Sequence, residues 1–180
     1  HLDDKAPNRP GVAPDVITWV DPDYLSAYRD QISALAADVD VAVASHHWGL
    51  KEDVLAYQKE IAHTAIDSGA KIVMGHGPHM PLGVEIYKDR PVFYGMGNFS
   101  FDIGHRAKHP DWIGTFATVE IEDGDLAEVS LQLIRHNPDN ETYLRNPGDE
   151  PEEMDNILNR SKVLGTELTV EQNRILVWKK

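Results

Sequence analysis

One feature constrains the fold of this chain more than any other: an apolar run is followed by a segment with helical spacing and then by a second apolar run. Residues 39–45 form an apolar run typical of a buried strand, and residues 52–68 carry apolar side chains at the spacing of a helix. A second short apolar run follows at residues 71–74. This order predicts a βαβ unit, whose connection is right-handed and whose two strands are parallel.

Each of the two predicted strands ends in a loop that contains histidines. His46 and His47 follow the first strand, and His76 and His79 follow the second. Parallel strands end on the same edge of a sheet, and in open α/β sheets ligands bind at that carboxyl edge. We therefore expect both histidine loops to converge on one candidate site.

Three of these histidines, His47, His76 and His79, form the predicted metal site. Neutral imidazole is the commonest protein ligand for metals, and three imidazoles leave a fourth position for water. A divalent ion such as Zn or Mn can lower the pKa of its bound water from 15.7 to about 7. The spacing alone leaves open the alternative that these are loop histidines that hydrogen-bond to the backbone.

Neighbouring residues are candidates for substrate binding. His46 alternates to the side opposite His47, which favours a supporting or substrate-contacting role, or else packing against a helix. Trp48 could stack on a sugar or peptide, or pack in the core. Asn98 and Asp102 lie in a glycine-flanked loop that could reach the same edge, or that an Asx turn stabilises.

The remaining pattern completes a single domain of the α/β class. We expect the α/β part to cover residues 1–136, and residues 137–180 to be an acidic extension packed on it. His63 lies on a charged helix face and is predicted to be solvated. Further predicted features are a β-branched run at 16–20, a helix after Asp21 and Pro22, hairpins at 84–94 and 115–135, and helices at 151–160 and from 170 onward.

Composition excludes several classes of function. The chain has 30 acidic and 17 basic residues and a formal charge of -13, with no basic patch in its sequence, so we expect no nucleic-acid partner. The absence of cysteine excludes disulfides and thiolate metal sites. No apolar run reaches the roughly 20 residues of a membrane helix, so the chain as given is expected to be soluble. The opening loop at residues 3–11 reads as the continuation of an upstream segment, so we expect a fragment.

Six sequence blocks in register resemble CapA-type proteins of poly-γ-glutamate capsule synthesis. The blocks lie at residues 45–49, 57–63, 66–70, 75–79, 83–87 and 97–102, and segments 9–14 and 21–23 look like the connecting part of that family. The resemblance implies a calcineurin-like metallophosphatase fold, a layered α/β sandwich with a two-metal centre at strand ends, of which this chain carries the second half. It also implies a protein that is extracellular or anchored to the membrane.

By motif, His47 matches the family histidine before Trp-Gly, and His76 and His79 match its Gly-His-x-Pro-His block. The acidic motifs that supply the other metal ligands in this superfamily are expected upstream, so a dinuclear centre cannot be completed from this chain. In members of that family, the position of Gly77 is often occupied by a further histidine, and the position of His46 is usually occupied by an apolar residue. The bridging asparagine of the superfamily precedes the histidine blocks, so its role is not assigned to Asn98.

The resemblance implies a metal-dependent hydrolase of cell-envelope polymer metabolism, active when an upstream half or a partner chain completes the site. A metal-activated water would attack an amide or a phosphoester. Proton abstraction from a peptide, with His79 or His76 as the base, is an alternative, because a fold does not fix its chemistry. A polymer-handling or assembly subunit without turnover is another alternative, and the missing acidic motifs favour it.

Overall fold

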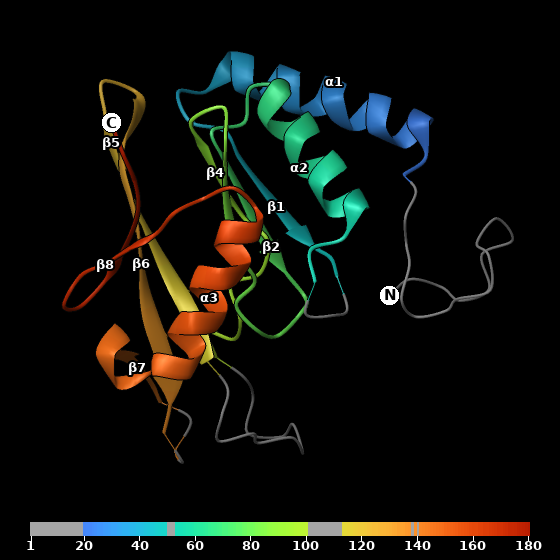
Figure 1. Ribbon diagram of the computed structural model, residues 1–180. Helices are drawn as coiled ribbons and strands as arrows, with labels where there is room; N and C mark the ends of the chain where they lie inside the picture. Colours follow the sequence, from blue (N-terminus) through green and yellow to red (C-terminus); the bar gives the residue numbers. More distant parts are fainter. Residues whose placement is uncertain (1–19, 50–52, 101–112, 138, 140) are drawn as a thin grey trace, which may run out of the picture.

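The computed structural model describes residues 20–49, 53–100, 113–137, 139 and 141–180, and it arranges two sheets and three α-helices in layers (Figure 1). The candidate residue Asp102 and the β-branched residues 16–19 lie outside the described part of the chain. The elements in chain order are α1 (Pro22–Asp38), β1 (Val43–His47), α2 (Ala56–Asp67), β2 (Ile72–His76), β3 (Val84–Tyr87), β4 (Arg90–Phe93), β5 (Ile113–Glu122), β6 (Asp125–His136), β7 (Thr142–Arg145), the 3-10 turn η1 (Pro147–Asp149), α3 (Pro151–Val163), β8 (Thr169–Val170) and β9 (Ile175–Lys179).

The first sheet contains the predicted βαβ unit. Its strand order is β1-β2-β4-β3, with β1, β2 and β4 parallel and β3 antiparallel to β4. Helix α1 begins where the sequence predicts, because the Asp21 side chain accepts a hydrogen bond from the Asp23 N–H at 2.9 Å and Pro22 fits the first turn. The expectation of a parallel strand-helix-strand unit with both histidine loops at one edge is confirmed.

The second sheet is antiparallel and contains both the predicted second hairpin and the C-terminal segment. Its order is β5-β6-β9-β8, and β7 pairs with the other end of β6. The predicted helix at 151–160 is confirmed as α3, whereas the helix predicted from 170 onward is wrong. That segment forms β8 and β9, because pairing of β9 with β6 buries Ile175 and Val177. The C-terminal residues therefore build a sheet of the same sandwich.

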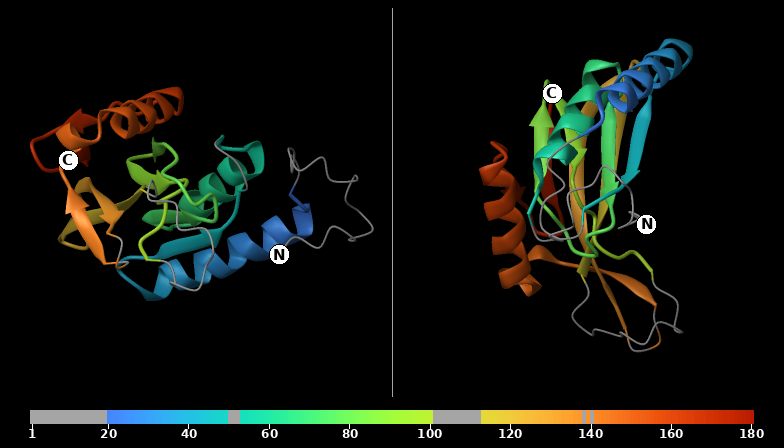
Figure 2. Two further views of the ribbon diagram at one scale, coloured as in Figure 1. Left: turned by 90° about the horizontal axis from the view of Figure 1, so that it is seen from below. Right: turned by 90° about the vertical axis from the view of Figure 1, so that its right-hand side faces the viewer.

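Two hydrophobic cores lie between the layers. The first core lies between the first sheet and helices α1 and α2. The second core lies between the two sheets and includes residues of α3, which packs on the opposite side of the molecule from α1 (Figures 1 and 2). This is a layered α/β sandwich, as the sequence predicts. Within the described residues, no helix combines the length and the apolar character that crossing a bilayer requires.

We predict that Leu133→Ala lowers the free energy of unfolding by about 2–5 kcal/mol, because it leaves a cavity between the sheets. Leu133 on β6 is fully buried in the second core. Leu144→Ala on the neighbouring β7 is the matched control, since that side chain is 57% exposed and its loss should cost under about 0.5 kcal/mol. Urea denaturation measures both, and equal losses would contradict this description of the core.

Candidate functional site

The carboxyl ends of β1, β2 and β4 meet at one edge of the first sheet, and we call the residues His47, His76, His79 and Asn98 there the histidine edge. His47 and His76 are directly opposite each other on parallel strands, which places their backbones about 4.8 Å apart. Strand alternation puts both side chains on the face of the sheet toward the second core, to which Ile72 belongs. The Trp48 N–H donates to the His76 carbonyl at 2.7 Å and extends this pairing beyond the strand.

Electrostatics favour a neutral His76. Burial lowers the pKa of its imidazole, and the neighbouring His47 lowers the pKa further because two imidazolium charges repel each other. His76 is partly buried and His47 is exposed. A neutral imidazole is the form that binds a metal ion.

His79 and Asn98 bring the loops after β2 and β4 together. The Nδ1 atom of His79 lies 2.8 Å from Oδ1 of Asn98, and the Asn98 side-chain amide donates to the His79 carbonyl at 3.2 Å. Asn98 is only 4% exposed, and His79 has a positive φ of 60°. The predicted approach of the Asn98 loop to the histidine loops is therefore confirmed, and the contact that Asn98 makes here fixes the His79 ring.

His46 and Trp48 lie on the other face of β1 and pack in the first core. The Trp48 ring is 6% exposed, stacks against His46 with centroids 4.8 Å apart, and donates from Nε1 to the Tyr94 carbonyl at 2.9 Å. His46 Nε2 lies 2.7 Å from the Tyr28 hydroxyl on α1. Packing, and not ligand stacking, is the role that these contacts support for Trp48. For His46 they support the alternative of a half-buried histidine against a helix.

Gly77 shows why the loop after β2 departs from the expected family pattern. Its φ is 118°, and a Cβ atom at this position would collide with the Trp48 carbonyl oxygen. A side chain at position 77 would require the two histidine loops to move apart. The further histidine that the family resemblance often places at position 77 is therefore incompatible with this local backbone.

Sequence reasoning missed the residues that support the loop after β1. The Gly49 N–H donates to the Tyr57 hydroxyl at 2.7 Å, and the buried Gln58 accepts from the Leu55 N–H at 2.7 Å through Oε1. Both side chains belong to the first turn of α2. The sequence gives one usable signal, because a glutamine three residues after a helix cap is typical of a capping arrangement.

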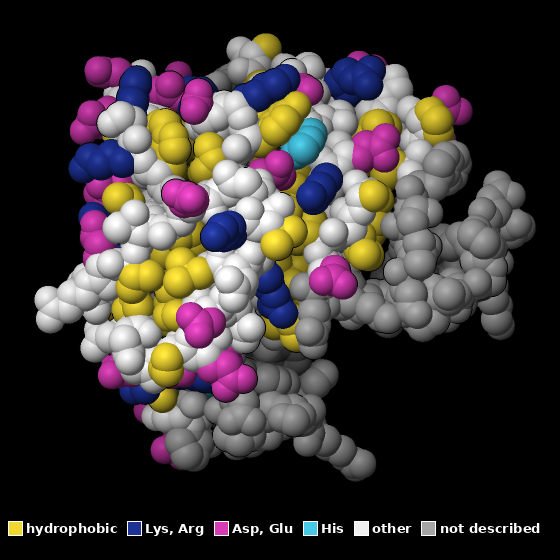
Figure 3. Space-filling view, in the orientation of Figure 1, with side chains coloured by type: hydrophobic (Ala, Val, Ile, Leu, Met, Phe, Trp, Pro, Cys, Tyr) yellow, Lys and Arg dark blue, Asp and Glu magenta, His cyan; other side chains and the backbone are white. Residues whose placement is uncertain are grey.

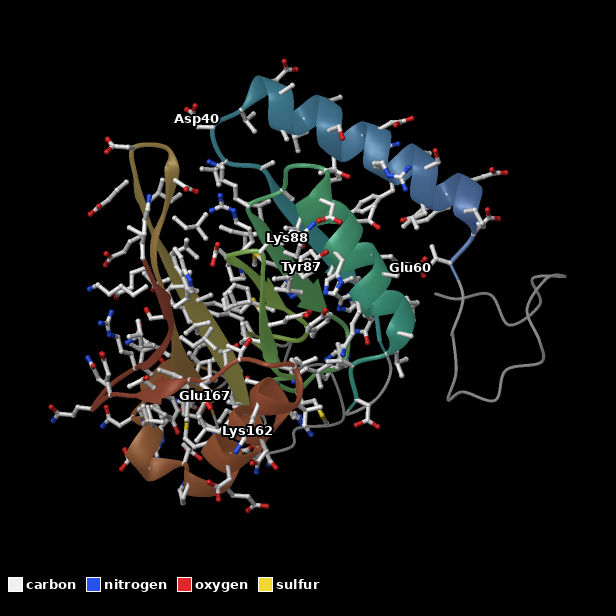
Figure 4. All side chains as sticks on the ribbon, turned by 45° about the horizontal axis from the view of Figure 1, so that its top comes forward. Asp40, Glu60, Tyr87, Lys88, Lys162 and Glu167 are labelled. Carbon is white, nitrogen blue, oxygen red and sulfur yellow. The ribbon has the colours of Figure 1, made fainter. Side chains whose placement is uncertain are left out.

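The prediction that His63 is solvated is wrong. Its ring stacks on Tyr87 at 3.8 Å, and its Nε2 lies 3.0 Å from Glu85, which also accepts from the Tyr94 hydroxyl at 2.5 Å. Tyr87 and its neighbour Lys88 lie beside α2 (Figure 4). Burial first, and then the contact with Glu85, raises the pKa of Tyr94 far above its ordinary value. No local pattern predicts this network, because Glu85 lies 22 residues beyond His63 in the sequence.

The number of metal-donating side chains at the histidine edge limits what this site can bind by itself. Among the residues that the structure describes, no group of three or more His, Cys, Asp or Glu side chains gathers closely enough to hold a metal ion. The donor chemistry of His47 and His76 fits a divalent metal, but the number of donors brought together is too small for a closed site.

On the face drawn in Figure 3, basic side chains are interspersed with acidic ones and form no broad positive surface.

Comparison with known proteins identifies a family and several relatives of this chain. A family model described as bacterial capsule synthesis protein PGA_cap matches residues 2–103. The PGA biosynthesis protein CapA of Bacillus subtilis is 35% identical over 99 residues, which are 54% of this chain and 24% of that protein. A probable polyglutamine synthesis accessory protein of Mycobacterium tuberculosis is 32% identical over 141 residues, 71% of this chain and 34% of its own length. The chain therefore spans about a quarter to a third of the length of these curated relatives.

We predict that the stability of the chain falls as the pH is lowered through the ordinary histidine range, and that His46 causes part of this fall. Burial lowers the pKa of His46 below 6.5, so between its folded and unfolded pKa values the unfolded chain binds more protons. The contribution of His46 is present above pH 6.5 and is lost as the pH falls toward its folded pKa. His46→Gln, which can still bond to Tyr28 but does not titrate, should reduce the slope of unfolding free energy against pH.

Urea denaturation between pH 5 and 7.5 measures this slope. The part that arises from His76 should remain in the His46→Gln variant, because burial also lowers the pKa of His76. His79→Gln is the control, since its exposed side chain lies outside the first core. Parallel curves for the wild-type chain and His46→Gln would show that His46 is not buried as described.

Proposed function

This chain belongs to the bacterial capsule synthesis protein family, and from that premise we propose that it carries the histidine part of a metal-dependent hydrolase that acts on poly-γ-glutamate. The observation that carries the proposal is the in-register pair His47 and His76 at the carboxyl edge of the first sheet. Two imidazoles on one face of adjacent parallel strands are spaced to share one ion. The carboxyl edge is also where α/β sheets bind their ligands.

The surrounding residues suit the two histidines for this role. Burial keeps His76 neutral, and the backbone bond from Trp48 to His76 holds the two strand ends together. His79 would be the third ligand or the proton-transferring base. When the His79 ring is neutral and donates from Nδ1 to Asn98, its Nε2 atom carries the lone pair that could bind a metal. Metal-binding histidines typically make a hydrogen bond through the ring nitrogen that does not bind the metal. The remaining donors would come from polypeptide outside the described residues, either further sequence or a partner chain.

The chemistry proposed for the site is hydrolysis of an amide or a phosphoester of a cell-envelope polymer. A bound divalent ion, Zn or Mn, would supply a water whose pKa is lowered to about 7. The residues of this chain would orient that ion through His47 and His76 and keep the His79 ring at a fixed angle through Asn98. The buried Trp48 and Tyr94 pack in the first core, on the opposite face of these strand ends.

A second candidate function is a polymer-handling or assembly subunit that retains the fold without turnover. The observation that favours it is the lack, among the described residues, of a group of three potential donors. The names of the relatives fit both candidates, because they refer to biosynthesis and to an accessory protein.

We predict that the chain, dialysed against limiting Zn or Mn, retains about one ion per molecule. His47→Ala and His76→Ala should each abolish retention, because either change leaves too few donors. His63→Ala is the matched control, since this histidine is bound to Glu85 away from the histidine edge. Mass spectrometry of metal content is the measurement. Equal metal content in all four proteins would exclude the histidine edge as the site.

Turnover distinguishes the two candidate functions. We predict that the metal-loaded protein, with the polypeptide that completes its site present, shortens poly-γ-glutamate and that His79→Ala slows this at least about 100-fold, as expected for loss of a proton-transferring group. Chromatography of the polymer measures its length, with His63→Ala again as the control. A protein that holds metal at His47 and His76 but leaves the polymer intact would favour the non-catalytic subunit.

A further inference from the structure

An open hollow lies at the end of the first sheet opposite the histidine edge. Its volume is about 530 Å³, within the range of about 300–1,000 Å³ that is typical of ligand sites. The end of α2, the turn before β2 and the turn between β3 and β4 surround it. We call it the amino-edge hollow. Its charged lining residues are Asp67, Lys71, Lys88 and Arg90, and Ile66 and Ala70 supply an apolar wall.

Backbone pairing brings two of these basic residues together. Strands β2 and β4 are parallel, with Val73 opposite Val92. The same register places Lys71 opposite Arg90, two residues earlier on each strand. Like charges opposite each other on neighbouring strands are destabilising, so this pair needs negative charge nearby.

The carboxylate of Asp125 supplies part of that negative charge. Arg90 donates from Nη1 to Oδ1 of Asp125 at 2.5 Å, and Nζ of Lys71 lies 3.8 Å from the same oxygen. Lys71 also donates to the Gly124 carbonyl. Two cations thus share one carboxylate. Within the described part of the chain, no hydrogen bond engages Nε or Nη2 of Arg90, so these donors can bind a ligand.

Lys88 adds a third cation at the rim of the hollow. Its Nζ lies 2.5 Å from Oδ1 of Asp67 and 5.1 Å from the centre of the Tyr87 ring. Figure 4 shows Lys88 and Tyr87 beside α2. The Lys88 and Asp67 side chains are 61% and 45% exposed, so water screens their ion pair. An anionic ligand can therefore join or replace Asp67 at little cost.

The balance of charge at the hollow is opposite to that of the whole chain, whose formal charge is -13. The lining has three basic side chains and one carboxylate, and cations remain in excess when Asp125 is included. Asp89, beside Lys88, is exposed and does not line the hollow. The negative end of the α2 dipole, about half a charge, reduces this excess without cancelling it. Charges more than about 10 Å away are largely screened at 0.1 M salt, so the local excess decides what binds.

We propose that the amino-edge hollow binds carboxylate groups of an anionic polymer. The Arg90 guanidinium has the planar pair of donors that matches both oxygens of a carboxylate, and Lys71 and Lys88 add positive charge beside it. Ile66 and Ala70 can contact the methylene groups that separate the charges of such a polymer.

The identity of the polymer, poly-γ-glutamate, rests on the proposed function, whereas the site itself does not. Lys71 precedes His76 by five residues along β2, so the hollow lies about 16 Å from the histidine edge. It would retain the polymer whether or not the histidine edge cleaves it.

A nuclear magnetic resonance titration of the whole chain with a short poly-γ-glutamate oligomer tests the proposal, without added metal and at about 0.1 M salt. We expect the backbone amides of Gly69, Ala70 and Lys71 to shift. Lys88→Gln should weaken the binding at least about 3-fold, because it removes one of the three cations. Lys162→Gln on α3 is the matched control, since the same charge change at this exposed position should alter binding less than about 1.5-fold.

A gain of affinity gives a second test that loss of folding cannot imitate. Asp67→Asn removes the carboxylate that competes for Lys88 and should tighten the binding at least about 2-fold. Asp155→Asn, which removes the same charge from an exposed position on α3, should leave the affinity unchanged. His76→Ala should also leave the shifts at the hollow unchanged, which separates this proposal from that of the hydrolase.

Three outcomes would overturn the proposal. Equal affinities of Lys88→Gln and Lys162→Gln would show that only the net charge of the chain matters. Shifts confined to the amides of Gly75 and Gly77 would place the polymer at the histidine edge alone. Inorganic phosphate that shifts the same amides at the same or lower concentration would assign the hollow to small anions.

Discussion

Parallel hydrogen bonding between β1 and β2 is the constraint on which the candidate site depends. It sets His47 directly opposite His76 and turns both side chains to one face. The pairing of β2 with β4 then brings the Asn98 loop to the same edge. A shift of one residue in the register of β1 would move His47 to the helix-facing side and His46 to the site, because side chains alternate along a strand. The chemistry of the edge is thus fixed by backbone pairing.

Trp48 holds that pairing in place through contacts on three sides. Its backbone bonds to His76, its indole N–H bonds to Tyr94, and its ring fills the space over Gly75, where a Cβ atom would collide with it. Tyr94 is in turn bound to the partly buried Glu85, which also contacts His63 on α2. A partly buried carboxylate with two hydrogen-bond partners is costly to disrupt. This chain of contacts joins the first sheet, α2 and the histidine edge into one rigid unit.

Among the described residues, two carboxylates in and beside the second sheet are each held by two basic side chains. Glu128 on β6 is held by Lys179 on β9 and by Arg174, and these contacts lower the pKa of its carboxyl. Glu150 is held similarly by Arg135 and Arg145. These pairs fasten the C-terminal segment to the second sheet.

The sequence by itself determined the elements whose signals are local. The spacing of apolar residues marks α1, α2 and the βαβ unit, and chain order with the handedness rule places both histidine loops at one edge. The six blocks of the family resemblance lie within residues 2–103, which the family model matches. Only the tertiary structure decided the features that depend on distant partners. Residues 175–179 form a strand because β6 offers them a partner, and His63 is partly buried because Glu85 approaches from β3. Trp48 is a core residue because Tyr94 and His46 enclose it. Apart from the stacking of His46 on Trp48, these contacts join residues far apart in the sequence, so their stabilising free energy appears only once the layers have packed.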